Sequence, residues 1–136
     1  MRNDALLCVA QKALIDKDGE VLVLNDPLLG LDLPGGKIQE EEIDLTGALK
    51  REVKEETGIE IEVGEPFSVW YYEFSNESSH RNKGKKIYTV AFKCKYLSGD
   101  VKLSDEHNLF EWVNKDNYSK LKTETNMYKA LEEYFK

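Results

Sequence analysis

One predicted helix constrains the fold of this chain more than any other segment, because its inward side is apolar at the start and acidic at the end. The helix is predicted over residues 44–57, since Asp44 is a typical N-cap and Gly58 a typical C-cap. At 100° per residue, its core-facing stripe comprises Leu45, Ala48, Leu49 and Val53.

Three glutamates lie in or beside this stripe. Glu52 and Glu56 fall in its angular sector further along the helix, and Glu55 lies beside them. Like charges four residues apart repel, and carboxylates in the last turn oppose the negative end of the helix dipole. At an effective dielectric near 20, two carboxylates about 6 Å apart repel by roughly 3 kcal/mol, whereas a divalent cation between them reverses the sign. The pattern therefore predicts an oxygen-rich site for Mg²⁺ or Mn²⁺.

A solvated helix face is the alternative explanation for these glutamates, and Lys50 and Lys54 do point outward. The position of the helix favours the metal site. Upstream of it, Leu33-Pro34-Gly35-Gly36 ends regular pairing and forces a backbone turn that another group must approach closely. Arg51 can reach Glu55 at i+4 and hold it in place.

The remaining segments predict a sheet with one more helix. Two apolar runs, 5–15 and 21–24, should form a hairpin, because Asp18-Gly19 supplies the positive φ angles of a tight turn. Further extended segments, rich in β-branched and aromatic residues, are expected at 59–63, 67–74, 87–96, 101–103 and 109–113. A C-terminal helix from about residue 123 has one face marked by Met127, Ala130, Leu131 and Tyr134. The polar stretch 75–86 is predicted to be a loop.

Composition limits the class of protein. The chain has 136 residues, 40% of them hydrophobic, which predicts one domain over residues 1–136 with its own core. The net charge of -7 disfavours binding to nucleic acid or to an anionic membrane. Cys8 and Cys94 lack CxxC spacing and are interpreted as reduced thiols, and we recognise no signal peptide or membrane span. These features predict a cytoplasmic protein, and we expect a monomer or homodimer.

Residues 36–59, GKIQEEEIDLTGALKREVKEETGI, resemble the Nudix box. That pattern is Gly, five residues, Glu, seven residues, then Arg-Glu-Φ-x-Glu-Glu-x-Gly-Φ, where Φ is aliphatic. Its second half is matched by Arg51, Glu52, Val53, Glu55, Glu56, Gly58 and Ile59. Taking Glu42 as the first glutamate satisfies the spacing from Gly36 but leaves eight residues before Arg51, so the loop ahead of the helix is one residue longer.

The resemblance implies a Nudix-like α/β/α sandwich with a mixed β-sheet between helices. It also implies an enzyme that uses Mg²⁺ or Mn²⁺ to cleave the pyrophosphate linkage of a nucleoside diphosphate derivative. The implied metal ligands are Glu52, Glu55 and Glu56, together with the backbone carbonyl of Gly35 or Gly36. Arg51 would orient the glutamates. No protein nucleophile is required, because a bound cation neutralises phosphate charge and lowers the pKa of a coordinated water.

The identity of the general base stays open at this point. Glu56 or Glu55 on the helix could activate the water, and so could Glu106 from the loop 104–108. Glu106 is equally well explained as a solvent-exposed loop residue without a catalytic role. His107 is interpreted as a structural or surface residue.

Lys37, Tyr72 and Phe110 are the candidate residues for binding substrate, the lysine through phosphate and the aromatic rings by stacking a base. The cations of the loop 75–86, Arg81 among them, are explained by solvation or by a mobile lid. A (d)NTP or its oxidised form is the leading substrate, ahead of ADP-ribose, ADP-sugars and dinucleoside polyphosphates. A catalytically silent, nucleotide-sensing or protein-binding module is the alternative of another class. Such modules usually lack part of the glutamate set, which is complete here.

Overall fold

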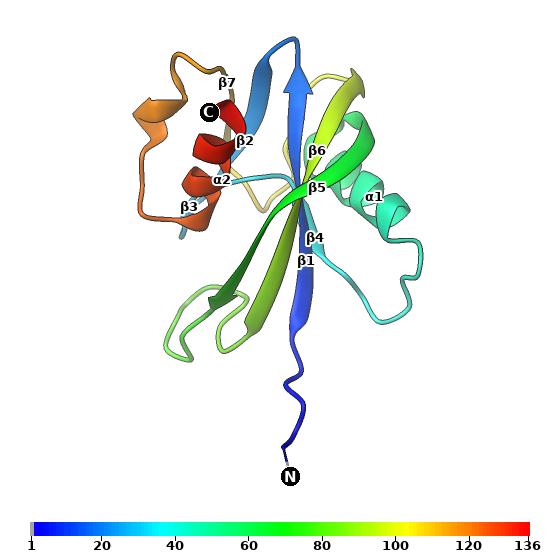
Figure 1. Ribbon diagram of the computed structural model, residues 1–136, viewed down its shortest axis with the longest axis vertical. Coiled ribbons are helices and arrows are strands. Elements are labelled where there is room, and N and C mark those ends of the chain that lie inside the picture. Colours follow the sequence, from blue (N-terminus) through cyan, green and yellow to red (C-terminus); the bar gives the residue numbers. More distant parts are fainter. Residues whose placement is uncertain (1) are drawn as a thin grey trace.

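The chain folds as an α/β/α sandwich in which a seven-stranded mixed sheet lies between helices, as the resemblance implies (Figure 1). The computed structural model describes residues 2–136; Met1, the first residue of the predicted domain, lies outside them. The strands are β1 (Cys8–Lys17), β2 (Glu20–Asp26), β3 (Gly30–Asp32), β4 (Gly35–Lys37), β5 (Glu60–Glu73), β6 (Lys86–Ser98) and β7 (Leu109–Val113). The helices are α1 (Leu45–Thr57), the 3-10 helix η1 (Tyr118–Leu121) and α2 (Asn126–Phe135).

Strand β1 has two different neighbours along one of its edges. On one edge it pairs in parallel with β6, from Cys8 to Asp16. On the other edge it pairs with β2 beside the hairpin turn, at Asp16 and Lys17, but with β4 further back, at residues 10–12. Strand β2 continues along β7 and β3. The sheet therefore opens between β2 and β4.

Two predicted local signals are confirmed in the backbone. Asp18 and Gly19 have φ angles of 52° and 88°, as a tight hairpin turn requires. Helix α1 begins after Asp44, whose side chain accepts a hydrogen bond from the N–H of Gly47 at 3.0 Å. It ends at Gly58, which adopts the left-handed conformation with a φ of 77°.

Each helix covers one hydrophobic layer of the sheet, and Figure 1 shows α1 and α2 on its opposite sides. The layer under α1 contains Leu49 and Val53 packed with Ile15, Leu22 and Ile61. The layer under α2 contains Leu131 packed with Leu14, Val21 and Val113. Leu45, predicted in the buried stripe, is 41% exposed, because the stripe begins one turn later at Ala48 and Leu49.

Two strand predictions need correction. Residues 60–63 and 67–73 are extended as predicted but belong to the single strand β5, because irregular pairing between Val63 and Ser68 still leaves both halves bonded to β6. Segment 101–103 is not a strand, because its backbone contacts the end of α1 instead. The N–H of Lys102 donates to the carbonyl of Thr57 at 2.8 Å, and that of Ser104 donates to Glu56 at 3.1 Å. These bonds satisfy the last carbonyls of α1 and hold the following loop beside its acidic end.

The C-terminal helix starts at Asn126 rather than near residue 123, since Thr125 is its N-cap and accepts a hydrogen bond from the N–H of Tyr128. Strands β3 and β4 were not predicted, because three residues each are too few for a periodic pattern. The turn at residues 33–36 does not end regular pairing, since Gly35 and Gly36 pair with β1. Among residues 2–136, no helix combines the length and the hydropathy that crossing a membrane requires.

Candidate active site

A cleft of about 440 Å³ lies at the opening between β2 and β4. One part of its lining is acidic and consists of Glu52 and Glu56 from α1 and Glu106 from the loop before β7. Another part is aromatic and consists of Trp70 and Tyr72, alternate residues of β5, and Phe74, which follows the end of that strand. Carboxylates and aromatic rings therefore face the same space.

The Pro-Gly-Gly turn fits between β1 and α1 because its glycines have no side chains. A Cβ on Gly35, whose φ is 146°, would lie 1.9 Å from the backbone oxygen of Gln11. A Cβ on Gly36 would lie 2.6 Å from Oε2 of Glu52. The close approach that the sequence predicted is thus made by β1 on one side and by a glutamate of α1 on the other.

Glu56 is the most buried carboxylate of α1. It is 5% exposed, and its Oε1 atom has no hydrogen-bond partner among residues 2–136. Burial raises the pKa of Glu56 to about 7, although the charges of Lys12 and His107 oppose that shift. Burial also raises the pKa of Glu52, against the charge of Arg51.

Arg51 connects α1 to the loop before it. Its Nη1 atom donates to both carboxylate oxygens of Glu55, at 2.7 and 2.8 Å, and its Nη2 atom donates to Glu42 at 2.8 Å and to Glu52 at 3.2 Å. Hydrogen bonds from Arg51 and from the N–H of Gln39 lower the pKa of Glu42. Glu42, in the longer loop, is thus a partner of Arg51. Glu55, predicted as a metal ligand, is half-exposed, pairs with Arg51 and lies outside the cleft lining.

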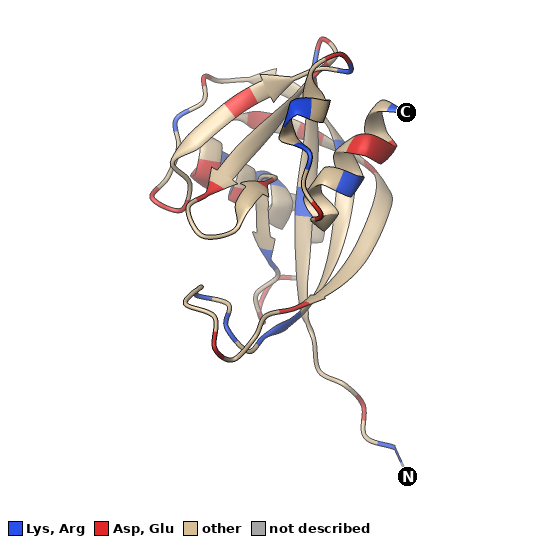
Figure 2. Cartoon of the chain, turned by 90° about the vertical axis from the view of Figure 1, so that its left-hand side faces the viewer, with Lys and Arg blue, Asp and Glu red and all other residues tan. Residues whose placement is uncertain are grey.

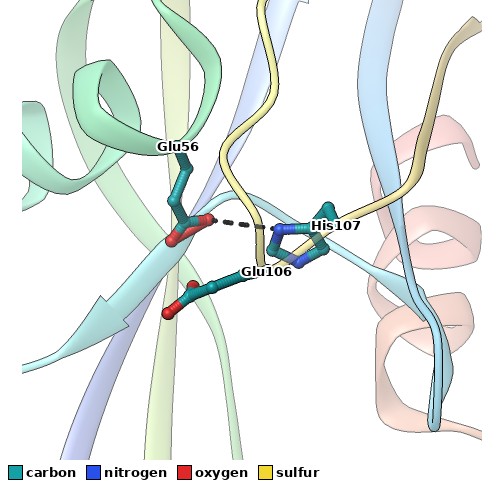
Figure 3. A group of neighbouring side chains, drawn as sticks. All are labelled: Glu56, Glu106 and His107. Atoms are coloured by element: carbon teal, nitrogen blue, oxygen red, sulfur yellow. Dashed lines mark ion pairs between the residues drawn. The ribbon is translucent and has the colours of Figure 1, made fainter.

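The loop before β7 brings two more groups to Glu56 (Figure 3). One ligand atom each of Glu56, Glu106 and His107 lie within 4.8 Å of one another. Nδ1 of His107 lies 3.9 Å from Oε1 of Glu56, and Nε2 lies 2.8 Å from Oδ2 of Asp32. His107 is therefore a buried member of the site, which its sequence position next to Glu106 could have indicated.

Lys12 and Asp32 form a buried ion pair that sequence reasoning missed. Nζ of Lys12 lies 3.0 Å from Oδ1 of Asp32 and donates to the carbonyl of Leu33 at 3.0 Å. Burial opposes both charges, but Lys12 and the hydrogen bond from His107 hold the pKa of Asp32 at about 2. The charges of Asp32 and Glu56 likewise raise the pKa of Lys12 despite its burial. A lone lysine inside an apolar strand was the signal that could have revealed this pair.

Two of the three residues predicted to bind substrate line the cleft, and the third does not. Lys37 and Tyr72 line the cleft, and burial together with nearby Lys85 lowers the pKa of Lys37. Phe110 lies outside the cleft lining, because it pairs on β7 with Leu24, a member of the layer under α1.

The groups at the acidic part of the cleft suit a divalent cation. Glu56 offers a buried carboxylate oxygen that is unpartnered within the described chain, and Glu52 and Glu106 offer two more carboxylates. The backbones of Gly35 and Gly36 also line the cleft. Mg²⁺ and Mn²⁺ prefer such oxygen ligands.

Comparison with known proteins gives concordant matches. A family model described as the NUDIX domain matches residues 9–134. A MutT-like protein of Streptomyces ambofaciens is 30% identical over 120 residues, which cover 88% of this chain and 71% of that protein. The crystal structure of a MutT protein from Methanosarcina mazei Go1 has a TM-score of 0.77 at 30% identity and covers 98% of this chain and 96% of its own. An Ap4A hydrolase of C. elegans shares the fold, with a TM-score of 0.73 at 24% identity over 94% of this chain and 95% of its own.

Proposed function

The chain belongs to the Nudix family and is a pyrophosphohydrolase, and on this premise we propose that it hydrolyses a (d)NTP or an oxidised (d)NTP with Mg²⁺ or Mn²⁺. The bond cleaved is a phosphoric anhydride of the triphosphate chain. A cytoplasmic location is part of the proposal, and the free thiols of Cys8 and Cys94 support it.

One observation carries the proposal: the carboxylates of Glu52, Glu56 and Glu106 and the rings of Trp70, Tyr72 and Phe74 line a single cleft of about 440 Å³. Pockets for small ligands span roughly 300–1,000 Å³, so this cleft has room for one nucleotide. A base can stack on Trp70 or Tyr72 while the phosphates lie against the acidic part. A triphosphate brings several negative charges to a site that already holds Glu52, Glu56 and Glu106, and this requires a cation.

Different residues of this chain have different roles in the proposed reaction. Glu52 and Glu56 would hold the cation with a backbone carbonyl of Gly35 or Gly36. When bound, the cation neutralises phosphate charge and lowers the pKa of a coordinated water. The carboxylate of Glu106 accepts the proton of the attacking water, since it is exposed to solvent beside Glu56. Arg51 keeps Glu52 oriented, and Lys37 contacts a phosphate oxygen.

The test is a panel of (d)NTPs, oxidised dNTPs, ADP-ribose, NADH and dinucleoside polyphosphates, assayed by the phosphate released after coupling enzymes. We expect turnover of a triphosphate with Mg²⁺ or Mn²⁺, and EDTA should abolish it. Preferred cleavage of ADP-ribose or of a dinucleoside polyphosphate would replace the proposed substrate but keep the chemistry. Absence of cleavage of every compound, with metal present, would support the silent sensing module instead.

A further inference from the structure

The loop that joins β5 to β6, residues 74–85, is built by its own polar side chains. Ser75 Oγ accepts from the N–H of Glu77, and Ser78 Oγ accepts from the N–H of His80. The N–H of Phe74 donates to the carbonyl of Lys85 at 2.9 Å and closes the base of the loop. Short side chains of this kind stabilise turns by bonding to nearby backbone groups. From the sequence alone, the charges of this stretch are explained by solvation or by a mobile lid.

His80 anchors this loop to β2. Its ring is buried, with 3% exposure, and stacks on Phe74 with centroids 5.0 Å apart. Nε2 of His80 lies 3.0 Å from Oδ2 of the buried Asp26, and Nδ1 accepts from the N–H of Asn82 at 3.1 Å. Because a backbone N–H can only donate, the proton of the neutral ring is on Nε2 and faces Asp26. Asp26 also accepts from the N–H groups of residues 28 and 29, so both carboxylate oxygens of Asp26 and both ring nitrogens of His80 have hydrogen-bond partners. We call this buried pair, His80 and Asp26, the anchor.

The anchor carries Arg81, the next residue, into the cleft beside the acidic groups. Figure 2 marks the Lys and Arg residues of this loop in blue. Nη1 of Arg81 lies 3.6 Å from Oδ2 of Asp26, and Nη2 lies 3.9 Å from Oε2 of Glu106. Both distances exceed that of a hydrogen bond. Nη1 of Arg81 also lies 3.3 Å from Nε2 of His80, but that nitrogen already donates its proton to Asp26. The guanidinium is thus attracted by two carboxylates while its N–H donors stay available.

We propose that Arg81 binds a phosphate group of the substrate at the acidic part of the cleft, and that His80 and Asp26 are positioning residues for it. This inference rests on the proposed function. A guanidinium presents paired donors that match two oxygens of a phosphate, whereas a half-exposed ion pair with Glu106 adds little stability. The phosphate would replace the long contact to Glu106 and leave the buried anchor unchanged. The ligand class is a phosphate chain with free terminal oxygens, such as a triphosphate or pyrophosphate.

Steady-state kinetics on Arg81→Ala and Arg81→Lys test the inference, with Lys83→Ala as the matched control. Lys83 is an exposed cation of the same loop that does not line the cleft. Loss of a charge-assisted phosphate contact should raise KM for the triphosphate roughly 10- to 100-fold in Arg81→Ala, with a smaller change in kcat. Arg81→Lys should show a smaller rise in KM, because lysine keeps the positive charge but lacks the paired donors of the guanidinium. Equal KM values for Arg81→Ala and Lys83→Ala would overturn the proposal.

A binding measurement separates this inference from the proposed function. Isothermal titration calorimetry of magnesium pyrophosphate needs no turnover, so it applies even to an enzyme that cleaves none of the nucleotides. We expect Arg81→Ala to bind pyrophosphate at least about tenfold more weakly than the wild type and Lys83→Ala to bind it equally well. Unchanged binding in Arg81→Ala contradicts the inference, whatever the substrate panel shows.

His80→Phe tests the anchor, because it keeps the ring against Phe74 but removes the donor to Asp26. We expect the melting temperature to show a folded protein and KM to rise in the same direction as in Arg81→Ala. A folded His80→Phe protein with the KM of the wild type would remove His80 from the positioning of Arg81. If His80→Phe does not fold, Asp26→Asn is the second variant, read by the same KM comparison.

Discussion

Oε1 of Glu56 lies 3.9 Å from Nδ1 of His107, and neither atom has a hydrogen-bond partner within residues 2–136. Nε2 of His107 faces Asp32, so Nδ1 is the ring nitrogen left to face Glu56. A proton shared between Oε1 and Nδ1, or a cation beside Oε1, would satisfy these buried atoms. The same contact joins the end of α1 to the loop before β7.

Without metal, the stability of the wild type should fall as the pH rises. The pKa of Glu56 is about 7 in the folded protein, above its ordinary value, because burial outweighs the attraction of Lys12 and His107, and Asp32 and Glu106 add repulsion. Its stabilising contribution is thus complete below the unfolded pKa and is lost as the pH passes through about 7. Relative to Glu56→Gln, the wild type should lose up to about 3 kcal/mol of unfolding free energy by pH 8 in EDTA. Denaturant titrations measure this, and a pH-independent difference between the two proteins would contradict it.

Glu56→Gln should reduce activity by at least ~10²-fold, because the amide keeps the size of the side chain but loses the charge that holds the cation. Its stability in EDTA should equal or exceed that of the wild type, since a buried charge is removed. Turnover with saturating Mg²⁺ and thermal melting in EDTA are the measurements. A variant that is markedly less stable but still active would mean that Glu56 is a structural partner and not a metal ligand.

Glu106→Gln should lower kcat more than it raises KM, because a group that takes the proton of the attacking water acts in the transition state. Asp105→Asn is the control, since Asp105 is the exposed neighbour in the same loop and does not line the cleft. Initial rates over a range of substrate concentrations separate kcat from KM. A rise in KM alone would assign Glu106 to binding and leave the base on α1.

Alanine at the two glycines of the turn should have different effects. In Gly36→Ala the new Cβ meets the end of the Glu52 side chain at 2.6 Å, so the carboxylate moves while the backbone stays. We expect Mg²⁺ to be needed at roughly 10- to 100-fold higher concentration, with little change in melting temperature. In Gly35→Ala the Cβ meets the backbone of β1 at 1.9 Å, so the protein should be strongly destabilised. Similar melting temperatures for both variants would refute this account.

Features that depend on residues only a few positions apart are predictable from the amino-acid sequence. The turn at Asp18 and Gly19 and the caps of α1 at Asp44 and Gly58 follow from local backbone preferences. The helical period placed Glu56 inward, and the spacing of Arg51 and Glu55 predicted their contact.

Contacts between residues far apart in the chain depend on how the strands pair in the folded protein. Lys12, Asp32 and His107 form one buried network across β1, β3 and the loop before β7, and Asp26 meets His80 across 54 positions. No periodic pattern encodes such pairs, because they arise where the neighbour of β1 changes from β2 to β4. The same topology placed Phe110 outside the cleft and carried Arg81 into it. Local chemistry sets the conformation of each segment, whereas the pairing of strands far apart in the chain sets which charged groups are buried together.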